Sequence, residues 1–455
     1  MQGVSQRCLH FIKRYLPNFE TVTRDTFSAA THYFHGLFQS EKCNMERMEE
    51  AVPNADEQQL QHFLSVSPWE EDAVCAQITR EANATLGGHP DSSLIVDESA
   101  ITKKGTHSAG VARQYNGRLG KIDNCQVGVF AALSHGTEAC LIGARLYLPK
   151  EWTKDPKRCR SVGIPKEHIR HRTKQTLALE LITQAREDGA KFSWVLVDGG
   201  YGHDLPFCQT LEEQLQETFI VGVHKTQRIY LDDPKPTIPE ANKPGRTPTR
   251  LRSQTSPTTV MKWAKAQRTS VWKPLTLRDS TKGELRVEVL WRRVWVWDGR
   301  SAKGRNWWLL VQRDPKTHAD YKYSLSNAAP SASGEELCRQ RAQRFWVERV
   351  FEDAKGQVGL DEYQSRGWRS WHHHMAMVSM ALLFLLEERQ LHKPQYPLLS
   401  CADVLALLCY ALPKRKVTDE EMMRQLEQRH RKRTASIEYH HRKQRVMARV
   451  QGTDG

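Results

Sequence analysis

The sequence predicts an α/β protein with a helical N-terminal region, a β-rich insertion and a basic helical C-terminal tail. Three observations carry this prediction. Apolar residues recur at helical spacing up to about residue 88, and short aliphatic runs then alternate with helical patterns as far as residue 224. A proline-rich stretch and further strand-like runs follow, and helical periodicity returns near residue 333.

The first 88 residues are expected to fold as helices. An apolar stripe that includes Phe11, Ile12 and Tyr15 begins the pattern, and DEQQLQHFLS at residues 56–65 continues it. The sequence GGHP at residues 87–90 ends this region, because glycine and proline favour turns.

The segment after residue 88 is predicted to hold a sheet with the element order β-β-β-α-β-α-β. Aliphatic runs bounded by turn residues indicate the strands, and apolar residues at helical spacing indicate the helices. The expected strands lie at 93–97, 125–133, 138–148, 191–202 and 218–224, and the expected helices at 173–189 and 205–217.

A linker and a β-rich insertion are expected next. Six prolines lie between residues 233 and 257, and alternating strand-like runs follow at 284–299 and 306–314. Seven of the thirteen tryptophans fall between Trp263 and Trp308, so this part is chemically distinct from the rest. Five domains are predicted. They are a helical N-terminal region (1–88), a sheet-containing segment (89–228), the linker and β-rich insertion (229–330), a helical segment (331–395) and a basic C-terminal tail (396–455).

Helical signals return after the insertion. Ser333 is a suitable N-cap, and a buried helix is predicted over residues 373–388. The tail from Lys414 to Arg449 carries 12 Lys and Arg against 5 Asp and Glu, which predicts a charged helix or a partly disordered arm.

Charge and cysteine spacing narrow the classes of function. The net charge is +14 and the pI is near 9.3, which favours a nucleic-acid partner, although a basic enzyme without such a partner has the same charge. The ten cysteines include no CxxC pair, which argues against a zinc ribbon and fits reduced thiols in a cytosol. The N-terminus is too polar for a signal peptide, and the longest apolar run is shorter than a membrane span. A cytoplasmic protein with no membrane partner is expected.

Two aspartates end similar aliphatic runs. Asp97 ends SLIVD and Asp198 ends WVLVD, and ligands of α/β sheets bind at the carboxyl ends of strands. If the two strands are neighbours, both carboxylates can share a metal ion. The alternative is that each aspartate only caps the turn that follows it.

A third carboxylate lies on the predicted helix RAQRFWVERVFEDAKG. Arg344, Glu348 and Lys355 fall on one helical stripe, where two cations and a carboxylate could bind phosphate beside a metal. An exposed, ion-paired face is the alternative, and Glu352 and Asp353 are rivals for the metal-binding role.

Three carboxylates suit two magnesium ions. Magnesium prefers oxygen ligands, and two ions can activate a water or a 3′-hydroxyl and stabilise the leaving oxygen in phosphodiester chemistry. The adjacent His372, His373 and His374 cannot share one helical face, so they are interpreted as a polar surface near DNA rather than as a metal site.

These segments resemble the DDE transposases of bacterial insertion sequences, in particular the cut-and-paste group with a Tyr-Arg-Glu-Lys signature. The resemblance covers roughly residues 5–390. It rests on three segments: VDESAITKKGTHSAGVARQYNGRLGKIDNCQVGVF, WVLVDGGYG and RFWVERVFEDAKGQVGLDEYQSRGWRSWHHHMAM. It implies a ribonuclease-H-like core and a nucleoid-associated bacterial protein.

The resemblance also assigns roles to residues. Asp97, Asp198 and Glu348 would form the catalytic triad and hold two Mg²⁺ ions, for which Mn²⁺ can substitute. The signature tyrosine falls at position 341, where this chain has an arginine. The residues expected to bind DNA phosphate are Lys103, Lys104, Arg341, Arg344 and Lys355. One tryptophan among Trp291, Trp295, Trp297, Trp307 and Trp308 could hold a flipped base.

The resulting hypothesis is a transposase that cleaves and joins DNA at its terminal inverted repeats. Its partners would be the double-stranded transposon ends and the target, and it would act as a homodimer that joins two ends through a hairpin intermediate. Two alternatives stay open: another ribonuclease-H-like nuclease, and a domesticated DNA-binding protein that no longer cleaves.

Overall fold

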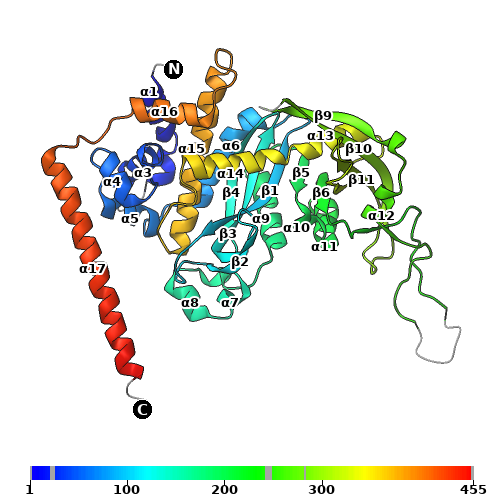
Figure 1. Cartoon of the computed structure of the whole chain (residues 1–455), viewed down its shortest axis with the longest axis horizontal. Coiled ribbons are helices and arrows are strands. Elements are labelled where there is room, and N and C mark those ends of the chain that lie inside the picture. Colours follow the sequence, from blue (N-terminus) through cyan, green and yellow to red (C-terminus); the bar gives the residue numbers. More distant parts are fainter. Residues whose placement is uncertain (1–2, 21–25, 241–247, 281–282, 452–455) are drawn as a thin grey trace.

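The computed structural model describes residues 3–20, 26–240, 248–280 and 283–451. Figure 1 shows a helical N-terminal part, a central twisted sheet with helices packed on it, a β-rich part beside the sheet, and a long C-terminal helix that projects from the body. The predicted α/β class is confirmed at this level.

The N-terminal region is helical, as predicted, and its aromatic side chains form a core. Phe11 stacks on Phe34 at 5.6 Å between ring centroids and meets Phe384 edge-on at 5.2 Å, which ties this region to the C-terminal part of the chain. The helices are α1 (Val4–Lys13), α2 (Leu16–Phe19), α3 (Phe27–Gln39), α4 (Met45–Ala51), α5 (Glu57–Ser65) and α6 (Glu71–Leu86).

The central sheet follows the predicted order, with one additional short strand. The strand β1 pairs antiparallel with β3 and parallel with β5, and β6 pairs parallel with β5 on its other side. The additional strand β2 escaped prediction because its sequence, ARQYN, has no run of apolar residues. The strands are β1 (Ser93–Thr102), β2 (Ala112–Asn116), β3 (Lys121–His135), β4 (Glu138–Leu146), β5 (Trp194–Val197) and β6 (Phe219–Val223).

The helix α9 is the predicted connection between β4 and β5. Thr173 caps it by accepting a hydrogen bond from the Thr176 amide, and its buried Leu181 and Ile182 face the sheet. This helix, α9, spans Lys174–Glu187, and the other elements of this segment are short: α7 (Lys150–Thr153), α8 (Pro156–Ser161), the 3₁₀ turn Lys166–His168, α10 (Gly199–Gly202), α11 (Leu205–Gln209) and a π-helical turn at Thr210–Gln214.

The β-rich insertion joins the central sheet and extends it. The strand β12 pairs antiparallel with β6, which places β12, β11, β10 and β9 in one sheet with β1 and brings that sheet to ten strands within the described residues. This pairing satisfies backbone groups that an exposed β6 edge would leave open. Part of the proline-rich stretch, 241–247, lies outside the described residues. The elements are β7 (Arg228–Ile229), β8 (Thr258–Thr259), α12 (Val260–Lys265), the 3₁₀ turn Thr269–Val271, β9 (Lys273–Ser280), β10 (Gly283–Val296), β11 (Arg305–Arg313) and β12 (Lys322–Ser326).

The C-terminal part is helical, and one of its helices, α15, lies buried in the core. The side chain of Ser333 caps the first helix, as predicted. The helix α15 is buried along most of its length, and none of the described helices is long and apolar enough to cross a membrane. The helices are α13 (Gly334–Ala342), α14 (Phe345–Gln357), α15 (Trp368–His392), α16 (Cys401–Ala411) and α17 (Asp419–Gln451).

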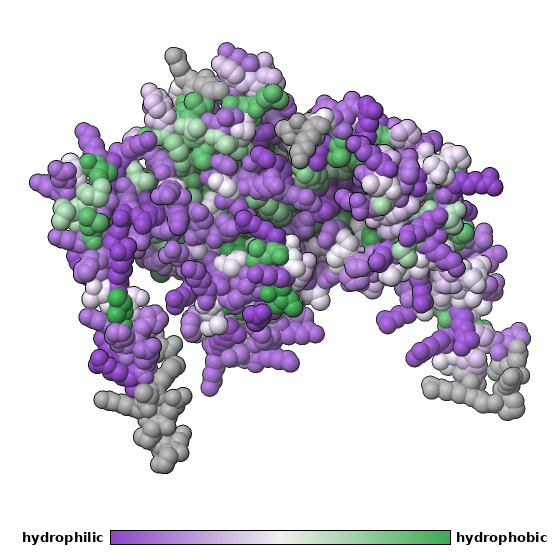
Figure 2. Space-filling model, in the orientation of Figure 1, coloured by the Kyte–Doolittle hydropathy of each residue, from purple (hydrophilic) through white to green (hydrophobic). Residues whose placement is uncertain are grey.

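The basic tail is a helix, which decides between the two forms that the sequence left open. The first half of α17 is held against the N-terminal region by ion pairs, among them Arg429 with Glu50 at 2.6 Å. The second half extends away from the body (Figure 1) and is mostly hydrophilic (Figure 2). The ten cysteines are all unpaired, in agreement with the prediction of reduced thiols.

The interpretation of His372, His373 and His374 as a polar surface near DNA is wrong. All three side chains are buried in the core, at 5%, 0% and 0% exposure. Burial lowers the pKa of His372 and His374 to about 3 and that of His373 to about 4, so the three rings are neutral at neutral pH. A ring nitrogen of each lies 3.0–3.1 Å from a backbone carbonyl, of Trp368, Trp69 and Gly359 respectively.

Candidate active site

Asp97 and Asp198 occupy matching positions on neighbouring parallel strands. The parallel register pairs Val96 with Val197, and each aspartate is the next residue along the chain. The expectation that Asp97 ends its strand is wrong, because β3 continues to pair with β1 as far as Thr102. Asp97 instead lies where the parallel pairing with β5 ends. The condition that the two strands be neighbours is met.

Backbone amides hold both aspartate side chains. Asp97 accepts a hydrogen bond from the Glu98 amide at 2.8 Å, and Asp198 accepts one from Gly200 at 2.8 Å as the N-cap of α10. The capping role that the sequence left open is therefore present at Asp198. It uses one oxygen of that carboxylate and leaves the other available.

The glycines that follow Asp198 allow α10 to pack directly on β6. A Cβ atom on Gly202 would lie 2.1 Å from the carbonyl oxygen of Gly222, and one on Gly222 would lie 2.8 Å from the Gly199 amide nitrogen. A larger residue at either position would push the turn away from the sheet. The sequence GGYG thus fixes the position of Asp198.

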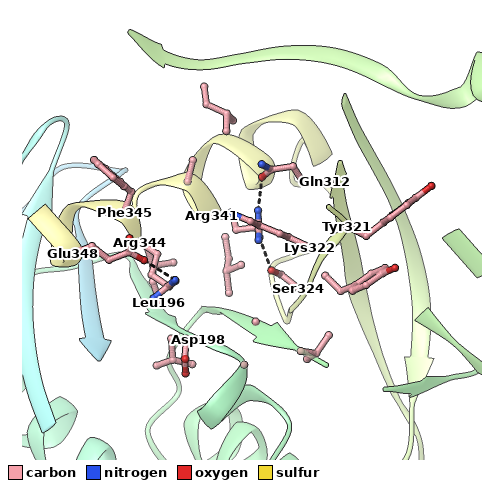
Figure 3. Close-up of a pocket in the computed structure, with 18 of the residues that line it drawn as sticks. Leu196, Asp198, Gln312, Tyr321, Lys322, Ser324, Arg341, Arg344, Phe345 and Glu348 are labelled. Carbon is pink, nitrogen blue, oxygen red and sulfur yellow. Dashed lines mark hydrogen bonds and ion pairs between the residues drawn. The ribbon is translucent and has the colours of Figure 1, made fainter. Parts of the chain in front are cut away.

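Arg344 connects two of the three predicted carboxylates. Its guanidinium lies 2.7 Å from the Asp97 carboxylate and 3.0 Å from that of Glu348. Glu348 is in the first turn of α14, and Arg344 is the N-cap residue that precedes this helix. Figure 3 shows Arg344 and Glu348 close to each other on one side of the pocket and Asp198 across from them.

Asp97 lies in an environment that disfavours its charge. Burial raises the pKa of the Asp97 carboxyl to about 7; Arg344 opposes this rise and Asp198 adds to it. The side chain is only 14% exposed. A buried carboxyl beside a second carboxylate is stabilised by a nearby cation, and Arg344 supplies that charge here.

An acidic cleft of about 970 Å³ opens beside these residues. Its hard oxygen donors are of the type that magnesium prefers. Within the described part of the chain, no group of three His, Cys, Asp or Glu side chains is arranged to hold a metal ion. Arg344 contacts both Asp97 and Glu348, so these two carboxylates would bind an ion only after their contacts with Arg344 are broken. The carboxylates that line the cleft are Asp97, Glu98, Asp198, Glu348, Glu352, Asp361 and Glu362.

The three carboxylates on α14 differ in their surroundings, and Glu348 is itself 53% exposed. Glu348 lines the acidic cleft together with Asp198 and also contacts Arg344. Glu352 lines the same cleft, but its side chain is 70% exposed and pairs with Arg349. Asp353 is buried against Arg349 and does not line the cleft.

A second, basic cleft of about 550 Å³ shares Asp198, Arg344 and Glu348 with the acidic one (Figure 3). Arg341 donates hydrogen bonds to Ser324 and Gln312, and no described carboxylate lies within ion-pair distance of it. Burial lowers the pKa of Arg341 to about 10. The basic residues of this cleft are Lys225, Arg278, Lys322, Arg341 and Arg344.

The three predicted lysines differ in their surroundings. Lys103 donates to the Tyr363 carbonyl at 2.8 Å and lies 3.6 Å from the centre of that ring, and burial lowers its pKa to about 8. Lys104 is exposed in the loop after β1. Lys355 lines the acidic cleft, with its Nζ 3.4 Å from the Ala100 carbonyl. Contact with DNA stays a prediction for each of them.

The predicted tryptophans lie outside both clefts. Trp307 is buried and donates to Glu212 at 2.9 Å, and Trp308 donates to the Ala329 carbonyl. None of the five candidates lines the acidic or the basic cleft, so the expected base-holding role has no support from their positions. The aromatic residues that do line the clefts are Tyr115, Tyr321, Tyr323, Phe345 and Phe351.

Comparison with known proteins gives two findings. A family model described as DDE superfamily endonuclease matches residues 14–284, a segment that includes Asp97 and Asp198 and ends before Glu348. A protein of Microchaete diplosiphon, named "Probable transposase for insertion sequence element IS701", is 24% identical over 314 residues, which are 68% of this chain and 69% of that protein. Both findings agree with the resemblance that the sequence segments indicate.

Proposed function

Because the chain belongs to the DDE superfamily of endonucleases, we propose that it is the transposase of an insertion sequence, which cleaves DNA at the terminal inverted repeats and joins the freed strand to a target. One observation carries this proposal. Asp97 and Asp198 follow paired residues of two parallel strands, and Arg344 contacts both Asp97 and Glu348. The relative from Microchaete diplosiphon supports the same activity.

In this proposal Asp97, Asp198 and Glu348 would hold two magnesium ions, which manganese can replace. Bound there, the ions would supply the Lewis-acid stabilisation that phosphodiester cleavage and strand transfer need. Arg344 would first release Asp97 and Glu348. Its guanidinium would then be free to bind a DNA phosphate in the basic cleft, where Arg341 already has no carboxylate partner among the described residues.

The arrangement of the strands supports a ribonuclease-H-like core. Three antiparallel strands, β4, β3 and β1, continue into the parallel strands β5 and β6. We assign the first half of this core to residues 89–228 and the second to 331–395, with the insertion between them. The helices before residue 89 would help to bind the transposon ends, and two copies would act together because two ends must be joined.

A DNA-binding protein without cleavage is the second candidate. Arg341 in the place of the signature tyrosine favours it, and so does the neutralisation of two carboxylates by Arg344. Both candidates predict DNA binding, and only the first predicts a metal-dependent cut.

The experiment is a cleavage assay on a linear duplex that carries the terminal repeat from the flanks of the gene. Wild-type protein is assayed with magnesium and with EDTA, and Asp198→Ala is assayed with magnesium. Cutting at the repeat tip that requires magnesium and that Asp198→Ala lacks would establish the transposase. Binding of the repeat without cutting, by wild type and variant alike, would establish the second candidate.

A further inference from the structure

The hairpin of β2 and β3 exposes an unusual group of large apolar side chains. Tyr115 is 60% exposed, Leu119 46% and Ile122 59%. Tyr115 and Ile122 are directly opposite each other in the antiparallel register, and Leu119 lies in the turn between them. Single exposed apolar residues are ordinary, but three on one short hairpin indicate a contact surface.

This hairpin is held firmly at its base and in its turn. Gln114 donates to the carbonyls of Gly110 and Cys125, at 3.3 Å and 3.0 Å. Asn116 is buried, and its side chain accepts a hydrogen bond from the Arg118 amide at 3.2 Å. The apolar side chains are therefore presented on a rigid support, which is what insertion into a stacked partner requires.

The position of the hairpin and its charges identify the kind of partner. Tyr115, Gly117 and Arg118 line the acidic cleft together with the three predicted catalytic carboxylates. Around the apolar residues are Arg113, Arg118 and Lys121, against one acidic residue of the hairpin, Asp123; Arg118 also pairs with Asp361 at 3.3 Å. In Figure 2 a small hydrophobic area in the lower middle of the molecule, where Figure 1 labels β2 and β3, is surrounded by hydrophilic residues. The cationic side chains of the hairpin would contact DNA phosphates while its apolar side chains contact bases.

We propose that this hairpin is a wedge for duplex DNA. Tyr115, Leu119 and Ile122 press between bases of the duplex that crosses the acidic cleft, and they open a base step beside the phosphate that faces Asp97 and Asp198. Apolar side chains inserted at a base step unstack the bases and kink the DNA. Stacking of a base on an aromatic side chain offsets part of the free energy that unstacking requires. The inference rests on the proposed function, because it takes the substrate to be DNA.

The test measures base unstacking directly. A duplex carrying the terminal repeat receives 2-aminopurine at successive positions near the cleavage site, and its fluorescence is read with the Asp198→Ala protein, which keeps the DNA intact. Tyr115→Ser with Leu119→Ser is added to this background. The matched control is Tyr410→Ser with Leu398→Ser, which makes the same changes at side chains 87% and 93% exposed on α16 and the loop before it.

We expect increased fluorescence at one position that the hairpin variant loses and the control keeps. In the cleaving protein, the hairpin variant should cut roughly tenfold more slowly, since a lost stacking contact of about 1–3 kcal/mol corresponds to roughly a fivefold to hundredfold effect. An abasic site at the same position should restore cutting, because such a duplex is already open there.

Equal fluorescence in the Asp198→Ala protein with and without the hairpin substitutions would overturn the wedge. If the variant instead changed only the oligomeric state of the protein without DNA, the surface would bind a second copy, and the wedge would also be overturned. Failure of the wild type to cut any duplex would refute the proposed function alone, since the fluorescence of the bound duplex still decides the wedge.

Discussion

Asp97→Asn is expected to stabilise the protein in the absence of metal, although it removes a predicted catalytic group. The folded state raises the pKa of the Asp97 carboxyl from 3.8 to about 7, mainly by burial. Below pH 3.8 the carboxyl is protonated in both folded and unfolded chains. As the pH rises towards 7 the unfolded chain releases this proton first, so the folded state loses stability across that interval.

The magnitude follows from the same pKa values. A difference of about three pH units at 1.36 kcal/mol each gives about 4 kcal/mol of stability that the wild type loses between pH 4 and pH 8 through Asp97. Asparagine is uncharged throughout this range. The variant should therefore gain up to about 4 kcal/mol over the wild type at pH 8 and little at pH 4.

The assay is urea denaturation of both proteins in EDTA at a series of pH values. Glu352→Gln is the control, because it neutralises a 70% exposed carboxylate on the edge of the same cleft and removes no buried charge. A difference between Asp97→Asn and wild type that stays constant from pH 4 to pH 8 would refute the reasoning. Added magnesium should stabilise the wild type more than the variant, because the ion favours ionised Asp97.

Three further predictions concern cleavage and DNA binding. Glu348→Ala should abolish magnesium-dependent cleavage with DNA binding retained, whereas Glu352→Ala should keep it; the reverse pattern would show that the wrong carboxylate was assigned. Truncation after Lys414 should weaken DNA binding and lower the slope of log K against log salt by about 0.9 for each contacting cation removed, and an unchanged slope would exclude α17 from the interface. Lys104→Gln should lower that slope, whereas Lys103→Gln should mainly reduce the free energy of unfolding, since Lys103 is bound to Tyr363.

The order of strands and helices was predictable because it depends on local patterns of apolar residues. The register that places Asp97 beside Asp198 could not be predicted, because the sequence of either strand alone does not show which residue of a distant strand it pairs with. The same limit explains the histidines at 372–374: polar residues were assigned to the surface, but their burial depends on carbonyls contributed by other parts of the chain. Tyr115 was missed because a single exposed tyrosine in a polar strand gives no periodic signal.

The break between α13 and α14 directs Arg341 and Arg344 to different partners. In one continuous helix these arginines and Glu348 would follow a single stripe. The amides of Gln343 and Trp346 instead bond three residues back, at 3.1 Å and 3.0 Å, which tightens the turn between the two helices. Arg341 then bonds to residues of β11 and β12, while Arg344 bonds to Asp97 on β1.

Arg344 should therefore couple the binding of DNA to the binding of metal. A phosphate in the basic cleft would compete with Asp97 and Glu348 for the Arg344 guanidinium, and a metal ion at those carboxylates would release the same guanidinium towards the phosphate. Linkage then requires each ligand to raise the affinity for the other by the same factor. Calorimetric titration of the wild-type protein with Mn²⁺, with and without a repeat duplex that carries an uncleavable linkage at the scissile position, measures that factor without cutting. Arg344→Gln should bring the factor close to one, and an unchanged factor in this variant would show that the coupling does not pass through Arg344.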